Sequence, residues 1–145
     1  MPKNTLITGV LGDIHSLGLR VLESVLRAAD FEVVYAGARL SVEDFIRAAQ
    51  ETDAGAILIS SSSGHAEIDA QGIRGLCREA GIERILLYIG GNLVVSQQLM
   101  AWTEIEARFR RLGFDRVYPT TVDLKDVVRD LRADLGIGSD PLPSS

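Results

Sequence analysis

Apolar residues along the chain alternate between short continuous runs and longer stretches with helical spacing. The short runs are typical of strands buried on both faces, and they lie at 5–11, 31–36, 56–60, 85–89 and 116–118. Between and after them, apolar positions recur every three or four residues, which predicts helices at 16–29, from 41 onward, 68–80, 96–112 and 124–135.

End signals support these helices. Ser41 is a good N-cap residue, and the acidic Glu43 and Asp44 that follow it suit the positive end of a helix dipole. Gly81 and Gly113 come directly after two of the predicted helices and are typical stop residues.

Strands that alternate regularly with helices predict an α/β fold. Right-handed crossovers then require a doubly wound, five-stranded parallel sheet with helices on both faces. We expect the flavodoxin-like strand order 2-1-3-4-5. One domain is expected over residues 1–136, followed by a Gly/Pro/Ser-rich flexible tail at 137–145.

Composition narrows the choice of partner and compartment. The 145 residues are 46% hydrophobic and carry a formal net charge of −5, which argues against binding to nucleic acid or to an anionic membrane by bulk attraction. No apolar run approaches the length of a membrane span. The single cysteine, Cys77, excludes an internal disulfide and fits a reducing compartment, so we expect a cytoplasmic protein.

Polar and glycine residues gather in the loops that follow the strands. In a sheet of this kind, ligands bind at the carboxyl ends of the strands, beside the point where the strand order reverses. Because the first, third and fourth strands should be neighbours, we expect their loops to converge on one cavity. These loops, with the one after the fifth strand, are 12–18, 60–65, 90–95 and 119–121.

Asp13 and His15 are two residues apart in the first of these loops. A carboxylate at this spacing can accept a hydrogen bond from one imidazole nitrogen and raise the basicity of the other, as around metal-bound histidines. Spacing alone leaves open a second interpretation, in which Asp13 caps the next helix and His15 is an ordinary polar loop residue. The serines at 60–63 can equally be a solvated loop, and Gly90-Gly91 a tight turn.

Three motifs at fixed spacing resemble the family of cobalamin-binding domains. Residues 13–18 match its Asp-x-His-x-x-Gly signature, 41 residues (19–59) precede Ser60 of the family's serine motif, and 27 residues (63–89) separate Ser62 from Gly90-Gly91. Within this family, residues 5–136 are most similar to the small cobalamin-binding subunits of glutamate mutase. Ser62 and Ser63 depart from the pattern, because the family has a leucine and an aromatic residue at these positions.

The resemblance implies a Rossmann-like domain that binds adenosylcobalamin with its dimethylbenzimidazole tail displaced from cobalt and inserted into the protein. His15 would replace the tail as the lower axial ligand of cobalt, and Asp13 would hydrogen-bond to His15. The residues that the resemblance assigns to the cofactor are Gly12, Asp13, Ile14, His15, Ser16, Gly18, Ser60, Ser61, Ser62, Gly90, Gly91, Asn92, Leu93, Val94, Val95, Ser96, Thr120 and Thr121.

The same resemblance implies an isomerase, methylaspartate mutase, in which this chain binds the cofactor and has no catalytic residue of its own. The radical rearrangement of L-glutamate to threo-3-methylaspartate would take place on a separate large subunit with a barrel fold. A heterotetramer of two small and two large subunits is expected.

Three other classes of protein fit the sequence less well. A corrinoid methyl carrier or a cobalamin sensor normally has a helical domain before this one, whereas the first strand here begins near residue 5. A phosphorelay receiver needs an aspartate and a lysine where this chain has Ser60 and Pro119. A zinc or iron site built from Asp13, His15 and His65 would leave the two motif spacings as coincidence.

Overall fold

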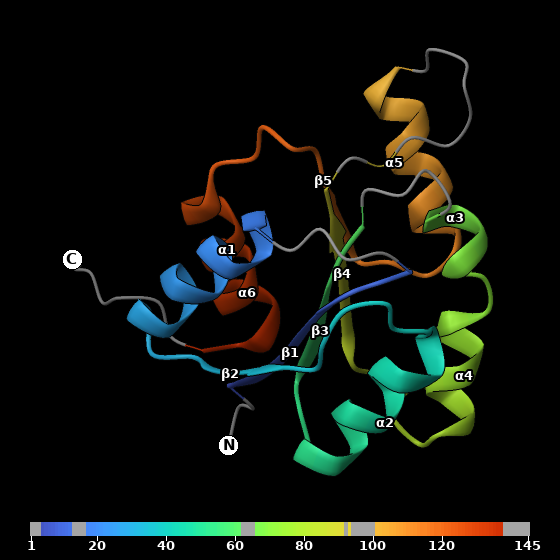
Figure 1. Cartoon of the computed structure of the whole chain (residues 1–145), viewed down its shortest axis with the longest axis horizontal. Helices are drawn as coiled ribbons and strands as arrows, with labels where there is room; N and C mark the ends of the chain where they lie inside the picture. The colour runs from blue at the N-terminus through green and yellow to red at the C-terminus, as the bar shows by residue number, and fades with distance from the viewer. Residues whose placement is uncertain (1–3, 13–16, 62–65, 92, 94–100, 138–145) are drawn as a thin grey trace.

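The computed structural model is a parallel sheet of five strands between two layers of helices (Figure 1). It describes residues 4–12, 17–61, 66–91, 93 and 101–137. The strands are β1 (Thr5–Val10), β2 (Glu32–Tyr35), β3 (Ala56–Ser60), β4 (Leu86–Gly90) and β5 (Arg116–Tyr118). Their order is β2-β1-β3-β4-β5, and every pair is parallel, which confirms the predicted topology.

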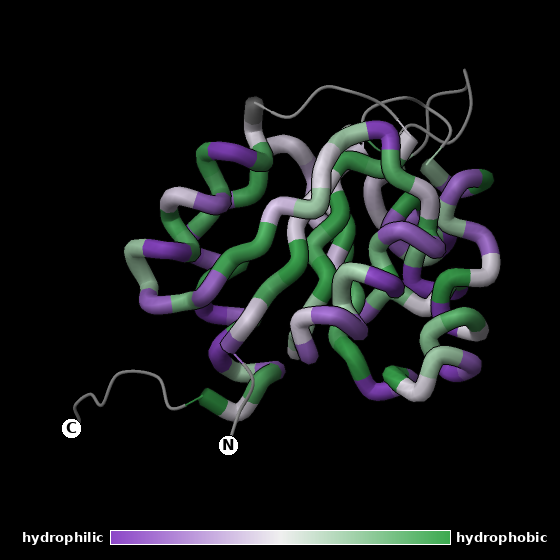
Figure 2. The backbone as a smooth tube through the Cα atoms, turned by 60° about the horizontal axis from the view of Figure 1, so that its bottom comes forward, coloured by the Kyte–Doolittle hydropathy of each residue, from purple (hydrophilic) through white to green (hydrophobic). Residues whose placement is uncertain are grey.

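Two helices, α1 (Leu17–Ala28) and α6 (Leu124–Leu135), cover one face of the sheet. The other face carries α2 (Val42–Thr52), α3 (Ala66–Asp69), α4 (Ile73–Glu79) and α5 (Trp102–Arg111). Successive side chains along a strand point to opposite faces of the sheet, so each strand contributes apolar side chains to both cores. Leu58 packs towards α1 and α6, whereas its neighbours Ile57 and Ile59 pack towards α2 to α5. In Figure 2 the central strands are mostly hydrophobic, and the helices alternate between hydrophobic and hydrophilic residues.

The structure confirms the predicted start of α2 and both predicted ends of α6. Ser41 and Asp44 form a reciprocal capping box at the start of α2. Asp123 caps α6, and Gly136 ends it with a φ of 70°. Beyond α6, Ile137 packs against the core, and the rest of the expected tail lies outside the described residues.

Two predicted helices were wrong in extent. The helix expected over 68–80 is divided into α3 and α4, because Gly72 between them has a φ of 78°, which a continuous helix does not contain. The helix expected over 96–112 begins only at Trp102, since the backbone of Ala101 is extended. Residues 96–100 of that prediction lie outside the described part of the chain.

A buried acidic residue fixes α1 to the sheet. Glu23 is 1% exposed and accepts a hydrogen bond from the hydroxyl of Thr8 on β1. Arg20, one turn earlier on α1, places its Nε 3.2 Å from the other carboxylate oxygen. The hydrogen bond to Thr8 thus joins the middle of α1 to β1. None of the described helices is long and apolar enough to cross a membrane.

Candidate functional site

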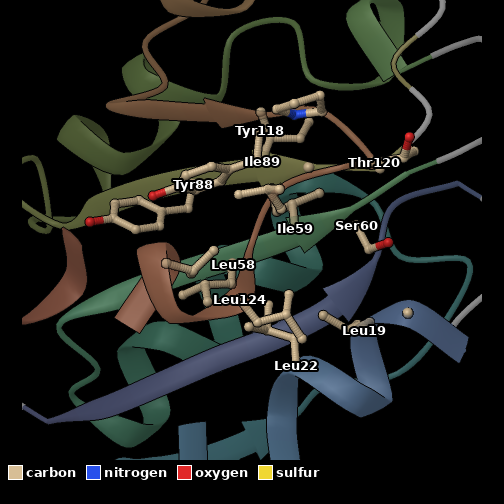
Figure 3. A pocket seen from close by; sticks show the side chains of 16 residues that line it. Leu19, Leu22, Leu58, Ile59, Ser60, Tyr88, Ile89, Tyr118, Thr120 and Leu124 are labelled. Atoms are coloured by element: carbon tan, nitrogen blue, oxygen red, sulfur yellow. The ribbon is translucent and has the colours of Figure 1, made fainter. Parts of the chain in front are cut away.

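A slot with a volume of about 240 Å³ lies between α1 and α6, over the carboxyl ends of β3, β4 and β5 (Figure 3). Its walls are mostly apolar: Leu19 and Leu22 come from α1, Leu124 and Val127 from α6, and Leu58 from β3. Ser60 and Thr120 lie together at one end of the slot, where the strands finish. The remaining lining residues are Gly18, Ile59, Tyr88, Ile89, Gly90, Gly91, Tyr118, Pro119 and Val122.

Gly91 is the residue that keeps two strand ends close together at the slot. Its φ is 113°, and a Cβ atom placed on it would lie 2.2 Å from the backbone oxygen of Ser61. No side chain fits there unless the segment after β3 moves away from the segment after β4. By contrast, a Cβ atom on Gly18 would meet no atom of the described residues outside its own stretch of α1 within 4 Å, so this glycine leaves space free beside the slot.

Two tyrosines form the far end of the slot, and α6 holds their hydroxyl groups outside it. The rings of Tyr88 and Tyr118 meet edge to face, with centroids 5.8 Å apart. The Tyr88 hydroxyl donates to Asp134, and the Tyr118 hydroxyl donates to Asp130 at 2.7 Å. Arg116 links the two carboxylates, with two hydrogen bonds of 2.9 Å to Asp134 and a contact of 3.6 Å to Asp130.

This network shifts the protonation of its members. The hydrogen bond from Arg116 lowers the pKa of Asp134, although partial burial acts in the opposite direction. Burial raises the pKa of Tyr88 and of Tyr118, and the hydrogen bonds to the α6 carboxylates raise these pKa values further. Both tyrosines are therefore neutral and act as donors at physiological pH.

The network predicts a specific acid sensitivity. Because the pKa of Asp134 is lower in the folded chain than in the unfolded one, its stabilisation is present above about pH 4 and is lost as pH falls through the folded value. Asp134→Asn should cost about 1–3 kcal/mol at pH 7 and should show a shallower loss of stability below pH 4. Urea unfolding at pH 7 and pH 3.5 measures both effects. Asp126→Asn is the matched control on α6, because its partner Arg129 is 70% exposed and the change should be about 0.5 kcal/mol or less.

The slot brings together five of the residues predicted from the sequence: Gly18, Ser60, Gly90, Gly91 and Thr120. Four others are described but are not part of its lining. Ser61 is fully buried under Gly91, Leu93 belongs to the core on the opposite face, and Gly12 and Thr121 are exposed. The remaining predicted residues are outside the described part of the chain: Asp13, Ile14, His15, Ser16, Ser62, Asn92, Val94, Val95 and Ser96.

Gly12 shows how the segment that carries Asp13 and His15 begins. Its N–H donates to the carbonyl of Leu40 at 3.1 Å, and its φ is 75°. A Cβ atom at this position would lie 2.5 Å from a carboxylate oxygen of Asp69 on α3. Gly12 therefore lies between α3 and the loop after β2, and in the described part of the chain that follows, Gly18 is the first residue of the slot lining.

Most of the apolar lining was not predicted as part of a site. Leu58, Tyr88 and Val127 read as ordinary core positions in the sequence, and they do belong to the core cluster under α1 and α6. The sequence contains no signal that separates a wall of a slot from packed core. On the opposite face of the sheet, Cys77 and Phe109 are fully buried, and Trp102 packs partly buried against the core there.

The slot lies at the carboxyl edge of a doubly wound parallel sheet, which is the place where proteins of this fold class bind their ligands. A family model described as B12 binding domain matches residues 3–114. The glutamate mutase sigma subunit of Clostridium tetani is 47% identical over 138 residues, which is 94% of this chain and 99% of the relative. That of Escherichia coli O157:H7 is 44% identical over 136 residues, 93% of this chain and 90% of the relative.

A cobalamin-binding protein of Desulfitobacterium hafniense superimposes with a TM-score of 0.71 at 17% identity. The match covers 91% of this chain and 59% of that longer one, and it shows likeness of fold alone. The sequence matches show the family, and the chain belongs to the B12-binding domains and, among them, to the glutamate mutase sigma subunits.

Proposed function

We propose that this chain is the cobalamin-binding subunit of an adenosylcobalamin-dependent glutamate mutase, an isomerase that rearranges L-glutamate to threo-3-methylaspartate. The observation that carries the proposal is the slot between α1 and α6 at the strand ends, whose described lining residues include no charged side chain. The names of the relatives, which share nearly the whole length of the chain, support the same assignment.

The described residues fit the nucleotide tail of a cobalamin. The slot offers leucine, valine and tyrosine walls to a flat aromatic base, and Gly18 leaves open space beside these walls. Ser60 and Thr120 provide hydroxyl groups at the end of the slot near the strand ends, where the polar ribose and phosphate of the tail would leave it.

We assign His15 as the lower axial ligand of cobalt, with the tail displaced, and Asp13 as its hydrogen-bond partner. The segment 13–16 connects Gly12 at the end of β1 with α1, whose first turn lines the slot. A histidine in this segment therefore lies a few residues before the turn of α1 that would hold the tail. The further candidates Ile14, Ser16, Ser62 and the residues of 92–96 would surround the same tail.

When bound, adenosylcobalamin supplies radical chemistry by homolysis of its cobalt–carbon bond. The chain's own residues orient the cofactor from one side and leave the opposite side of the corrin to another protein. We propose that this partner is a large barrel-type catalytic subunit, which binds the substrate and excludes water. A cytoplasmic heterotetramer of two small and two large subunits is the assembly we expect.

A corrinoid methyl carrier shares the fold but is less well supported. The monomethylamine corrinoid protein of Methanosarcina barkeri is 20% identical to this chain, whereas the glutamate mutase sigma subunits reach 41–47%.

Titration with cobalamin tests the proposal. Purified protein should convert added cob(II)alamin to a spectrum in which the dimethylbenzimidazole no longer coordinates cobalt, while nitrogen from the protein does. Asp13→Asn should weaken binding roughly 10–100-fold, because the histidine loses the carboxylate that orients it and raises its basicity. Asp53→Asn, at the opposite edge of the sheet, is the control and should bind as the wild type does. Equal affinities of Asp13→Asn and the wild type would reduce Asp13 to a helix cap.

A further inference from the structure

A second hollow, separate from the slot, lies between α1 and α6, which run side by side on one face of the sheet (Figure 1). This groove has a volume of about 650 Å³ and shares no lining residue with the slot. Its described lining includes three basic side chains and no acidic one, although the chain carries a formal net charge of −5. We call it the basic groove, and its lining residues are Val25, Ala28, Ala29, Lys125, Val128, Arg129, Arg132, Ala133 and Ile137.

Two basic groups of the groove are available to an acidic partner. Lys125 is exposed and forms no ion pair with any residue that the structure describes. Arg129, one turn further along α6, lies 3.0 Å from Asp126 and 3.7 Å from Asp130, but its own side chain is 70% exposed. Ion pairs so exposed contribute little to stability, so Arg129 can change partner at small cost. Together with the valine and alanine side chains, these charges suit an occupant that is both acidic and apolar.

The end of α6 directs the chain towards the basic groove. Gly136 has a φ of 70°, and the N–H of Ile137 donates to the carbonyl of Arg132 at 3.0 Å. These are the features of a Schellman turn, which bends the chain back across the last turn of a helix. Because Ile137 itself lines the groove, the residues that follow it start at the groove's edge.

The sequence after Ile137 has the composition that the groove requires. Residues 138–145 contain one acidic and one large apolar residue, Asp140 and Leu142. Each of them directly precedes a proline, and a residue before proline favours an extended backbone. In an extended backbone, side chains two positions apart point to the same side. Asp140 and Leu142 therefore favour a conformation in which both face one surface, and less entropy is lost when they bind to it.

We propose that residues 138–143 occupy the basic groove. In this arrangement the carboxylate of Asp140 pairs with Arg129, and the side chain of Leu142 packs between Val25 of α1 and Val128 of α6.

The chain is long enough for both contacts. Arg129 precedes Ile137 by eight residues of helix, which is about 12 Å along the axis. Asp140 follows Ile137 by three residues, which span about 10 Å when extended, and the two long side chains cover the remainder. Leu142 follows by five residues, or about 16 Å, and Val128 lies about 14 Å back along the helix.

The bound segment would contact both helices that form the walls of the slot. Leu19 and Leu22 of α1 and Leu124 of α6 line the slot, whereas Val25 and Val128 of the same two helices line the basic groove. Residues 138–143 would thus hold α1 against α6 from outside the slot.

Paramagnetic broadening in NMR spectra of the full chain tests the proposal without any cofactor. A nitroxide is attached through Ser144→Cys, since the native Cys77 is fully buried and burial raises the pKa of its thiol. Signals of Val25 and Ala28 in the groove should lose most of their intensity. Signals of Gly55, in the hollow on the other side of the end of α6, should keep theirs.

Two lysine variants of the labelled chain test the pairing. Asp140→Lys places a positive charge on the side that faces Arg129, so it should restore the Val25 signal. Ser139→Lys is the matched control, because it adds the same side chain on the opposite side of the extended segment and should leave the Val25 signal weak. Salt at about 1 M should also restore that signal, because the Debye length falls to about 3 Å.

Three outcomes would overturn the inference. Equal broadening of Val25 and Gly55 would mean that the segment has no preference for the groove. Equal effects of Asp140→Lys and Ser139→Lys would remove the pairing with Arg129. Broadening between spin-labelled and isotope-labelled copies in a mixed sample, in place of broadening within one copy, would mean that the groove receives a second chain. None of these results bears on cobalamin binding, so the proposed function is tested separately.

Discussion

Without a second polypeptide, the purified chain loaded with adenosylcobalamin is expected to convert no L-glutamate to 3-methylaspartate. The reason is the shape and chemistry of the site. The slot lies at one edge of the sheet and has no charged lining side chain, so its described walls offer nothing to bind the two carboxylates and the ammonium group of glutamate. A corrin is also too broad to be enclosed by a slot of about 240 Å³, so its reactive side remains open to water.

Addition of the large subunit should restore turnover, and the rate should saturate as that subunit is titrated. The measurement is formation of 3-methylaspartate with the small chain alone, the large chain alone, and both together, each with adenosylcobalamin. His15→Gly serves as the matched variant in the combined assay. Turnover by the small chain alone would refute its assignment as a cofactor-binding subunit.

Gly91→Ala should impair both folding and cofactor binding. The positive φ of this residue is strained for alanine and costs about 1–3 kcal/mol. Its Cβ would lie 2.2 Å from the Ser61 carbonyl, and relief of this overlap costs about another 1–3 kcal/mol. Moving Ser61 also moves Ser60, which lines the slot, so cobalamin affinity should fall at least about tenfold, the equivalent of 1.4 kcal/mol.

Gly18→Ala separates binding from folding. Among the described residues, this Cβ meets no atom within 4 Å outside its own stretch of α1, and alanine is up to about 1 kcal/mol better than glycine within a helix. Thermal stability should therefore stay the same or rise. The added methyl group narrows the space beside the slot, so cobalamin should bind more weakly. Gly75→Ala on α4, also in open space but remote from the slot, should gain stability and leave binding unchanged. Unchanged affinity in Gly18→Ala would show that the tail does not enter beside α1.

The sheet could be predicted from the sequence because its strands are short apolar runs and its helices carry clear end signals. The prediction of a continuous helix over 68–80 was wrong, because a glycine inside a helical pattern is compatible with either a helix or a break. At Gly72 the tertiary structure selects the break, which separates α3 from α4. The start of α5 could not be predicted, since Ala101 is a good helix former that is extended here.

Some residues of the candidate site could likewise be predicted from the sequence, and others could not. Residues with unusual chemistry or unusual backbone freedom, such as Ser60 and Gly91, could be found in the sequence, and the structure brings them to one slot. Leu58, Tyr88 and Val127 could not be distinguished from core, because a wall of an apolar slot obeys the same burial rule as the core. The hydrogen bonds of the two tyrosine hydroxyls could not be predicted either, because their acceptors on α6 are distant in sequence. Asp130 is 12 positions from Tyr118, and Asp134 is 46 positions from Tyr88.

Electron paramagnetic resonance of the cob(II)alamin complex is the most direct test of the central claim, that a protein histidine replaces the cofactor's own base while that base occupies the slot. In protein uniformly labelled with nitrogen-15 and mixed with unlabelled cobalamin, the axial nitrogen should split each cobalt line into a doublet. Unlabelled protein should give a triplet, and His15→Gly should abolish the protein-dependent doublet. A triplet in the labelled complex would mean that the cofactor's own base still coordinates cobalt, and would contradict the account.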